Sequence, residues 1–383
     1  MQDEEALNTE EDWGVVLAML PEGWQAKARE LGALRRCRRF GSAESLLRIL
    51  LIHLADGCSL RETVVRARLG KIADVSDVAL LKRLKASGEL LRWLAEQVMR
   101  NWVHKQPVAL FGNDLSVRVI DGSLIQEPGS TGSNWRIHYS IRLPSLQCDE
   151  VLVSGPKVGE SFQQFQVHEG DLFVADRGYA HAEGIAHVVK GGADVLVRTN
   201  LGNMRLVKED GSRFPLLERL RNLKGTGAGD WDVWVKMDTP IRGRICAIRK
   251  SRQAALRARR QALRNSSRKC QRIKPQTLEA ADYTFVFTTL DRSFSPATVL
   301  EMYRGRWQIE LVFKRLKSII GLGHLKKTDS DAAKAWIHGK LLVAFLIEAL
   351  ITAGESFSPW GYPTQEQQIS KSMEGELAHA PST

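Results

Sequence analysis

Three acidic residues of this chain lie at positions from which a carboxylate could act on a bound substrate. Asp121 follows an apolar run at residues 115–120, and Asp176 follows a second run at residues 172–175. Short apolar runs of this kind predict strands, and the carboxyl end of a strand presents its side chains to a cleft. An Asp at a strand end also forms turns, so each residue has a structural interpretation beside the functional one.

Glu310 lies where polar side chains recur at helical spacing. Residues 295–320 predict one long helix with a proline at its first position. At 3.6 residues per turn, one face of that helix carries a stripe of four polar side chains: Tyr303, Arg306, Glu310 and Lys317. Arg306 and Lys314 lie one turn from Glu310 and could hold its carboxylate ionised. A solvated, salt-bridged helix face is the alternative interpretation of this polar stripe.

The polar stripe, written as Tyr303-x2-Arg306-x3-Glu310-x6-Lys317, resembles the signature of the DDE insertion-sequence transposases of the IS-four family. Two further segments resemble the sequences around that family's first and second catalytic aspartates: Asp121-Gly122-Ser123 and Asp176-Arg177-Gly178-Tyr179. The three motifs occur in the family's order, and the long gap before Glu310 suits the family's β-rich insertion. The resemblance covers roughly residues 30–350.

The resemblance implies a catalytic core in which Asp121, Asp176 and Glu310 bind divalent metal. Cutting a phosphodiester requires an activated water and a stabilised leaving oxygen, and two cations about 3.5–4 Å apart provide both. Magnesium prefers carboxylate oxygens, so a site of three carboxylates suits it. We therefore expect two Mg²⁺ ions per site, with Mn²⁺ as an alternative. The same ions could next activate the freed 3′-hydroxyl for attack on target DNA.

The resemblance also implies residues that contact DNA near the cleaved bond. The three other members of the polar stripe would bind phosphates, an arginine by a bidentate fork and a lysine as a point charge. The further expected DNA contacts are Arg177, Lys314, Trp231, Trp234, Arg257, Arg260 and Arg264. Trp231 and Trp234 are three residues apart in a predicted strand, so at most one can stack on a flipped base. Packing within the core of the insertion is the alternative for both.

The elements expected around these residues give an α/β fold class. The predicted architecture is a mixed sheet with flanking helices, which the resemblance implies to be ribonuclease-H-like, interrupted by a β-rich insertion and preceded by an all-α N-terminal domain. The expected parts are a helical DNA-binding domain (1–106), a first core segment (107–200), the insertion with a basic helix (201–281), a second core segment with the Glu310 helix (282–355), and a polar tail (356–383). A purely structural bundle is the alternative for the N-terminal helices.

The positive charge of the chain is concentrated in one segment. There are 55 Lys and Arg against 44 Asp and Glu, a net charge of +11. Residues 1–30 are acidic, whereas residues 249–274 contain eleven basic side chains and no acidic one. A basic segment of this kind is typical of a surface that follows the phosphate backbone of DNA, and a solvated helix face is the alternative.

These observations together predict a DNA transposase that cleaves DNA at transposon ends and transfers 3′-hydroxyl ends into target DNA. The expected partners are double-stranded DNA at terminal inverted repeats, target DNA, and a second copy of the chain in a homodimer on DNA. Two alternatives stay open. The chain could be a catalytically silent DNA-binding remnant that regulates transposition, or a ribonuclease-H-like nuclease.

The sequence gives no indication of a membrane protein. The most apolar run, at residues 341–350, is about half the length that a bilayer requires and contains Glu348. The five cysteines are scattered and form no CxxC pair, which argues against a disulfide framework or a zinc ribbon. We therefore expect a cytoplasmic protein, associated with the nucleoid when it is bound to DNA.

Overall fold

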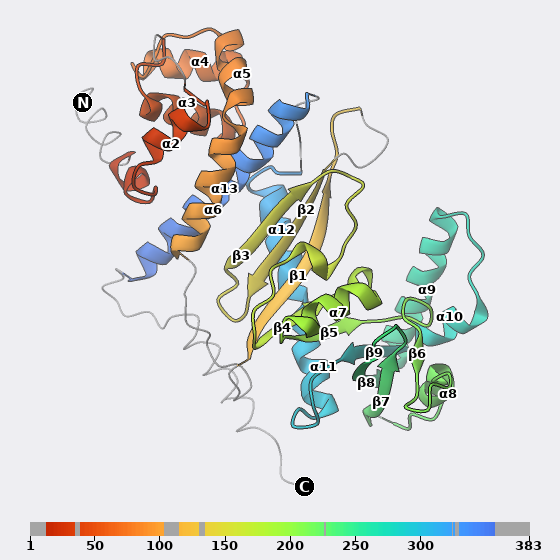
Figure 1. The fold of residues 1–383 in the computed structure, drawn as a ribbon. Helices are drawn as coiled ribbons and strands as arrows, with labels where there is room; N and C mark the ends of the chain where they lie inside the picture. The colour runs from red at the N-terminus through yellow and green to blue at the C-terminus, as the bar shows by residue number, and fades with distance from the viewer. Residues whose placement is uncertain are drawn as a thin grey trace.

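The computed structural model describes residues 13–34, 39–102, 115–129, 135–225, 227–323, 325 and 329–356. Its described strands form one nine-stranded mixed sheet in the order β3-β2-β1-β4-β5-β9-β8-β7-β6 (Figure 1). Apolar side chains from alternate positions of these strands are buried on both faces of the sheet, in two hydrophobic clusters. The predicted mixed α/β architecture is therefore confirmed.

The first half of the sheet combines antiparallel and parallel strands. Its antiparallel part consists of β1 (Ser116–Ile125), β2 (Trp135–Arg142) and β3 (Cys148–Ser154). Two strands run parallel to β1, namely β4 (Asp171–Ala175) and β5 (Asp194–Arg198), and the helix α7 (Ala182–Lys190) connects them. The sequence predicts that β1 ends near Asp121, but the strand continues to Ile125 because β2 still pairs with it there.

The predicted insertion adds strands to this same sheet. It contains β6 (Leu206–Val207), α8 (Leu216–Arg221), β7 (Gly229–Val235), β8 (Ile241–Arg249), α9 (Arg252–Arg268) and α10 (Pro275–Ala280). The strand β9 (Tyr283–Thr288) pairs with β5 on one side and with β8 on the other. The insertion therefore extends the core sheet by pairing with an edge that would otherwise be open.

The prediction of one continuous helix over residues 295–320 is wrong. The structure contains two helices, α11 (Pro296–Arg304) and α12 (Trp307–Ser318), which lie on one face of the sheet. Around Gly305 the backbone hydrogen bonds run three residues back, from Gly305 N to Met302 O and from Arg306 N to Tyr303 O. Glycine is a weak helix former, and such tighter bonds interrupt an α-helix.

The other face of the sheet is covered by short elements. These are the 3₁₀ turns η1 (Phe162–Gln164) and η2 (Arg177–Tyr179), together with α7. Phe162 packs edge-on against Phe173 of β4, with ring centroids 5.7 Å apart. The turn η2 begins directly after β4, so packing on this face fixes the backbone that follows Asp176.

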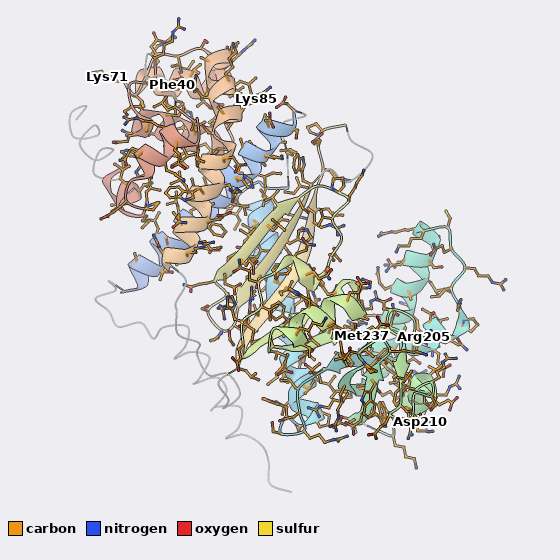
Figure 2. The ribbon with its side chains drawn as sticks, viewed as in Figure 1. Phe40, Lys71, Lys85, Arg205, Asp210 and Met237 are labelled. Atoms are coloured by element: carbon orange, nitrogen blue, oxygen red, sulfur yellow. The ribbon has the colours of Figure 1, made fainter. Side chains whose placement is uncertain are left out.

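Helices from both ends of the chain pack together beside the sheet. The N-terminal helices are α2 (Trp24–Glu30), α3 (Ala43–Ala55), α4 (Leu60–Leu69), α5 (Asp77–Ala86) and α6 (Gly88–Trp102). Ser42, Ser59 and Ser76 cap α3, α4 and α5, each accepting a hydrogen bond from a backbone N–H three residues on. The last described helix, α13 (Ser330–Ser356), lies along α6 (Figure 1). Lys85, which is labelled in Figure 2, lies at the end of α5 and pairs with Asp329 at 3.0 Å.

The helix α13 is the one described helix long and apolar enough to cross a membrane by length and composition. However, 72% of its most apolar window is buried inside the protein. Gly339 lets it approach α3, because a Cβ atom there would overlap the side chain of Leu54. A buried core helix accounts for the apolar composition of α13.

Candidate active site

Strand register brings Asp121 and Asp176 to neighbouring positions. The strands β1 and β4 run parallel, and their register pairs the residue before Asp121 with the residue before Asp176. Each carboxylate accepts a hydrogen bond from backbone just beyond it, at 2.8 Å from Gly122 N and at 2.6 Å from Gly178 N. The two aspartates are therefore held side by side where β4 ends.

Glu310 is joined to this pair through Arg306. A guanidinium nitrogen of Arg306 lies 3.7 Å from Asp121 Oδ2, and a second one contacts Glu310 Oε1. The side chain of Glu310 is 48% exposed, against 19% for Asp121. One positive charge is thus shared between the first and third of the expected catalytic carboxylates.

A fourth carboxylate, which no sequence motif signals, lies against the two aspartate segments. Glu160 is in the loop between β3 and η1, and its Oε1 is 3.8 Å from Arg136 Nη1. A Cβ atom on Gly122 would lie 3.1 Å from Glu160 Oε1, and one on Gly178 would overlap Glu160 Oε2. The glycines that follow Asp121 and Asp176 therefore leave room for this carboxylate.

Burial and like charges make the carboxylate cluster electrostatically unbalanced. Burial raises the pKa of Asp121 to about 7; the N–H of Gly122 and the charge of Arg306 oppose the shift, while Asp176 and Glu160 add to it. Burial also raises the pKa of Glu160, and Asp176 reinforces that rise. Such a site favours the arrival of further positive charge.

The polar stripe lies beside the carboxylates although its helix is divided. Burial raises the pKa of Tyr303, against the positive charges of Arg306 and Arg198. Burial lowers the pKa of Lys317, and the charge of Asp121 opposes that fall. The tertiary structure thus brings Tyr303 and Lys317 within electrostatic range of the groups around Asp121. Lys314 is exposed and makes no ion pair with any described residue.

The other expected DNA contacts are spread over the second half of the sheet. Trp231 packs against the hydrophobic cluster on one face of β7, and Trp234 lies on the opposite face, as the spacing predicts. The helix α9 has no buried residue, and its exposed side chains include Arg257, Arg260 and Arg264. Arg177 is exposed in η2, directly after Asp176.

The donor set suits a hard divalent cation, but the side chains are not arranged around one. Among the described residues, no three His, Cys, Asp or Glu side chains converge closely enough to hold a metal ion. Asp121, Asp176 and Glu310 nevertheless offer only carboxylate oxygens, which Mg²⁺ and Mn²⁺ prefer. The Arg306 guanidinium stands in for a cation between Asp121 and Glu310.

Comparison with known proteins assigns the family. Residues 157–346 match the family described as "Transposase DDE domain". The chain is 33% identical over 359 residues to InsL of insertion sequence element IS186A from Escherichia coli K12, covering 91% of this chain and 96% of InsL. It is also 33% identical over 360 residues to the transposase for insertion sequence element IS421 from Escherichia coli, with the same coverage. The chain belongs to the DDE transposases of insertion sequences.

The relatives of this transposase are of the IS-four type, as the polar stripe predicts. The matched domain contains Asp176 and Glu310, whereas Asp121 lies before its first residue. A chain from the "Cryo-EM structure of piggyBac transposase synaptic complex with hairpin DNA" has a TM-score of 0.40 at 10% identity, covering 96% of this chain and 84% of that one. This similarity is too low to assign a fold.

Proposed function

We propose that this transposase cleaves phosphodiester bonds at the ends of its insertion sequence and transfers the freed 3′-hydroxyl ends into target DNA. One observation supports this above the others. Asp121 and Asp176 are adjacent on parallel strands, and Arg306 links Glu310 to them, although the three acidic residues are far apart in sequence. We assign these three residues as the catalytic carboxylates.

The carboxylates would hold Mg²⁺, or Mn²⁺ in its place, with two ions per site. When bound, such ions activate the attacking hydroxyl and stabilise the leaving oxygen of a phosphodiester. The chain's own residues prepare the site for them. Gly122 N and Gly178 N fix Oδ1 of each aspartate; Oδ2 of Asp121 faces Arg306 at 3.7 Å. Arg306 offsets part of the negative charge of Asp121 and Glu310 in the absence of DNA and metal.

The cations of the polar stripe would then position DNA. A guanidinium released from Asp121 and Glu310 can bind a phosphate through two parallel hydrogen bonds, which suits Arg306 to the DNA strand at the cleaved bond. Lys317 and Tyr303 lie on the same side of the sheet and would contact neighbouring phosphates. Arg306 would thus exchange one anionic partner for another as the substrate binds.

The proposed fold and partners follow from the same arrangement. We propose that β1–β5 form a ribonuclease-H-like core, because the antiparallel strands β1–β3 continue into the parallel strands β4 and β5. Asp121 on β1 and Asp176 after β4 lie at adjacent positions of this sheet. The helices α2–α6 would form an all-α DNA-binding region. Double-stranded DNA at terminal inverted repeats and target DNA are the proposed partners, in a homodimer on DNA and in the cytoplasm. The helix α9 is basic and has no buried residue, which supports a contact with DNA.

A strand-transfer assay tests this function. Purified protein is incubated with Mg²⁺, labelled DNA from the ends of its own insertion sequence, and a target plasmid. We expect cleaved ends and joined products from wild type, and neither from Asp176→Asn, which should still bind the DNA. Asp291→Asn, a change in an exposed loop, is the matched control and should behave as wild type.

The same assay distinguishes the alternatives. Cleavage without joining by the wild type would indicate a nuclease. Binding without cleavage would indicate a DNA-binding remnant or regulator of transposition. If Glu310→Gln cleaved as well as wild type, the assignment of Glu310 as a metal ligand would be wrong.

A further inference from the structure

Positive side chains continue the sheet edge on which Asp176 lies. The strands β4 and β5 are parallel, and their register pairs the last residue of β4 with Val197. Arg198, the last residue of β5, therefore lies next to Asp176. Arg177 follows Asp176 in the chain, so two arginines flank the second aspartate, one along the backbone and one across the sheet.

A third cation reaches this edge from the inserted strands. β8 runs in the same direction as β5, because each is antiparallel to β9, which lies between them. Lys250 follows the last residue of β8. Its backbone N donates to Asp282 O at 2.9 Å, and its Nζ donates to Ala281 O at 2.7 Å. These bonds hold the ammonium group in place at the carboxyl edge of the sheet.

The three cations lack carboxylate partners of their own. In the part of the chain that the structure describes, neither Arg177 nor Arg198 forms an ion pair. Asp282, the acidic residue nearest to Lys250, is already paired with Arg259 in a two-pronged contact.

Their mutual repulsion is visible in the electrostatics of the group. Burial lowers the pKa of Lys250 to about 8, and the charges of Arg198 and Arg177 lower it further. Burial also lowers the pKa of Arg198; Tyr303 and Asp176 oppose this shift, while the charges of Arg177 and Arg306 add to it. Three cations that lie near one another, and that form no ion pair with a carboxylate among the described residues, make a site that an anion could complete.

We propose that Arg177, Arg198 and Lys250 bind a phosphate of the DNA strand next to the one that is cleaved. This inference rests on the proposed function, because it places the bound phosphate beside Asp176. Two guanidinium forks can grip the oxygens of one phosphate, while the lysine adds a point charge. The site would fix the strand in register so that the next phosphodiester lies over the aspartates. Its ligand is either an internal diester or a terminal 5′-phosphate.

The test measures DNA binding without catalysis. Full-length Arg198→Gln is titrated in EDTA against fluorescent duplexes from the ends of its own insertion sequence, at several salt concentrations. We expect Kd to rise about tenfold and the salt slope to fall by about one charge. Arg221→Gln is the matched control: it removes the same charge, but this arginine is already paired with Glu279, so Kd should change less than about twofold.

Further variants and probes keep the result interpretable. Lys250→Gln should reproduce the defect, and Arg198→Lys should restore part of the affinity, even if Arg198→Gln proves unstable. Duplexes with and without a 5′-phosphate identify the source of the ligand. A defect confined to 5′-phosphorylated DNA indicates a terminal phosphate, and an equal defect on both duplexes indicates an internal diester.

The proposal is overturned if Arg198→Gln and Lys250→Gln both bind DNA as tightly as the Arg221→Gln control, with unchanged salt slopes. That outcome would leave the transposase function intact, provided that Asp176→Asn still abolishes cleavage. Conversely, the phosphate site would stand and the catalytic assignment would fail if the cation variants lost affinity while Asp176→Asn cleaved normally.

Discussion

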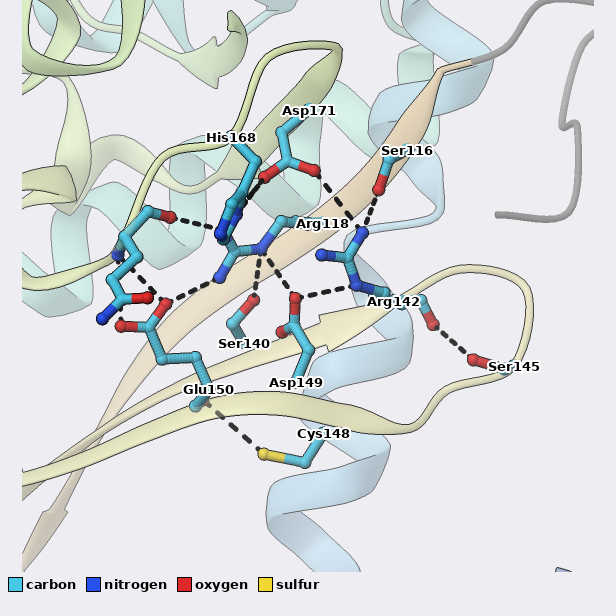
Figure 3. A network of polar contacts seen from close by, with 11 residues as sticks. Ser116, Arg118, Ser140, Arg142, Ser145, Cys148, Asp149, Glu150, His168 and Asp171 are labelled. Atoms are coloured by element: carbon cyan, nitrogen blue, oxygen red, sulfur yellow. Dashed lines mark hydrogen bonds and ion pairs between the residues drawn. The ribbon is translucent and has the colours of Figure 1, made fainter. Parts of the chain in front are cut away.

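One strand, β1, carries two charged clusters that differ in how completely their charges are satisfied. Arg118 is 1% exposed and bonds to three carboxylates, with Nε 2.8 Å from Asp149, Nη2 2.8 Å from Glu150 and Nη1 3.1 Å from Asp171 (Figure 3). Arg142 adds a second positive charge, 3.1 Å from Asp149. This Arg118 network closes on itself, and its charges leave little capacity for an external ligand.

Three residues further along β1, around Asp121, the charged side chains are less completely paired. Asp121 has a cation only at 3.7 Å, and Asp176 and Glu160 repel it. On β5, two strands away, Arg198 lies beside Asp176 but forms no ion pair with any described residue. The difference teaches that burial of charge alone does not mark a functional site. In the Arg118 network every carboxylate pairs with an arginine within the protein, whereas at the candidate active site Asp176 and Arg198 form no ion pair with any described residue.

The largest expected effect is on stability, in the Arg118 network. Arg118→Met should lower the free energy of unfolding by about 3–5 kcal/mol, because three buried carboxylates would lose their common partner. Urea denaturation followed by circular dichroism measures the change. Arg66→Met, which breaks an exposed pair with Asp56, is the control and should cost less than about 1 kcal/mol. A cost for Arg118→Met as small as that of the control would show that the network is not structural.

The next largest effect is on catalysis, at Asp176 of the candidate active site. Asp176→Asn should reduce single-turnover DNA cleavage by at least about a hundredfold, equal to about 3 kcal/mol of transition-state stabilisation. The melting temperature should stay the same or rise, because a crowded negative charge is removed. Gel-based cleavage and differential scanning calorimetry give the two values. A large fall in melting temperature would show that Asp176 has a structural role. The difference between the candidate active site and the Arg118 network would then not hold.

Glu348, an acidic residue on α13, provides a pH-dependent test of what burial of an ionisable group does to stability. Burial raises the pKa of Glu348 on α13 to about 7, with Arg315 opposing the shift. A carboxyl whose pKa is higher in the folded protein than its ordinary value of 4.5 binds protons preferentially in the folded state. Its ionisation therefore destabilises the fold above pH 7, and this cost disappears as the pH falls from 7 toward 4.5.

Glu348→Gln should thus stabilise the protein at pH 8 by about 2–3 kcal/mol, with no gain at pH 4.5. Parallel urea melts of both proteins across that range test this expectation. A stability difference that does not change with pH would mean that Glu348 is solvated and ordinary. DNA binding should be unaffected, in contrast to Arg198→Gln.

The smallest effect concerns the exposed helix α9. Replacing Arg257, Arg260 and Arg264 by Gln should flatten the salt dependence of DNA binding by up to about three charges, with little change in melting temperature. The control replaces three arginines that already pair with acidic residues: Arg221, Arg292 and Arg304. Equal salt slopes for the two triple variants would assign α9 to a solvated surface.

Much of the fold is local and could be predicted. The Ser caps of α3, α4 and α5, the strands β2 to β5 and the basic helix α9 follow from side-chain patterns within a few residues. The predictions failed where distant contacts decide the outcome. β1 extends past Asp121 because β2 pairs with it, and the predicted helix over residues 295–320 breaks at Gly305.

The residues of the candidate site also divide into those that the sequence identified and those that only the structure revealed. Asp121, Asp176 and Glu310 stand in recognisable motifs, so the sequence by itself determined the family and the residues to examine. Glu160 lies in a loop without any such pattern, and Arg198 ends a strand like many other arginines. Only the parallel register of β1, β4 and β5 places Arg198 beside Asp176, and only the approach of Glu160 to Gly178 reveals the fourth carboxylate.

The physical reason is that sequence patterns report local backbone preference, whereas electrostatic balance depends on which charges meet in space. Arg118 and Arg198 are alike as strand residues next to apolar neighbours. The sequence determined that each is an arginine on a buried strand. The tertiary structure decided that Arg118 pairs with three carboxylates, whereas Arg198 lies among Arg177, Arg306 and Asp176 and forms no ion pair with any described residue.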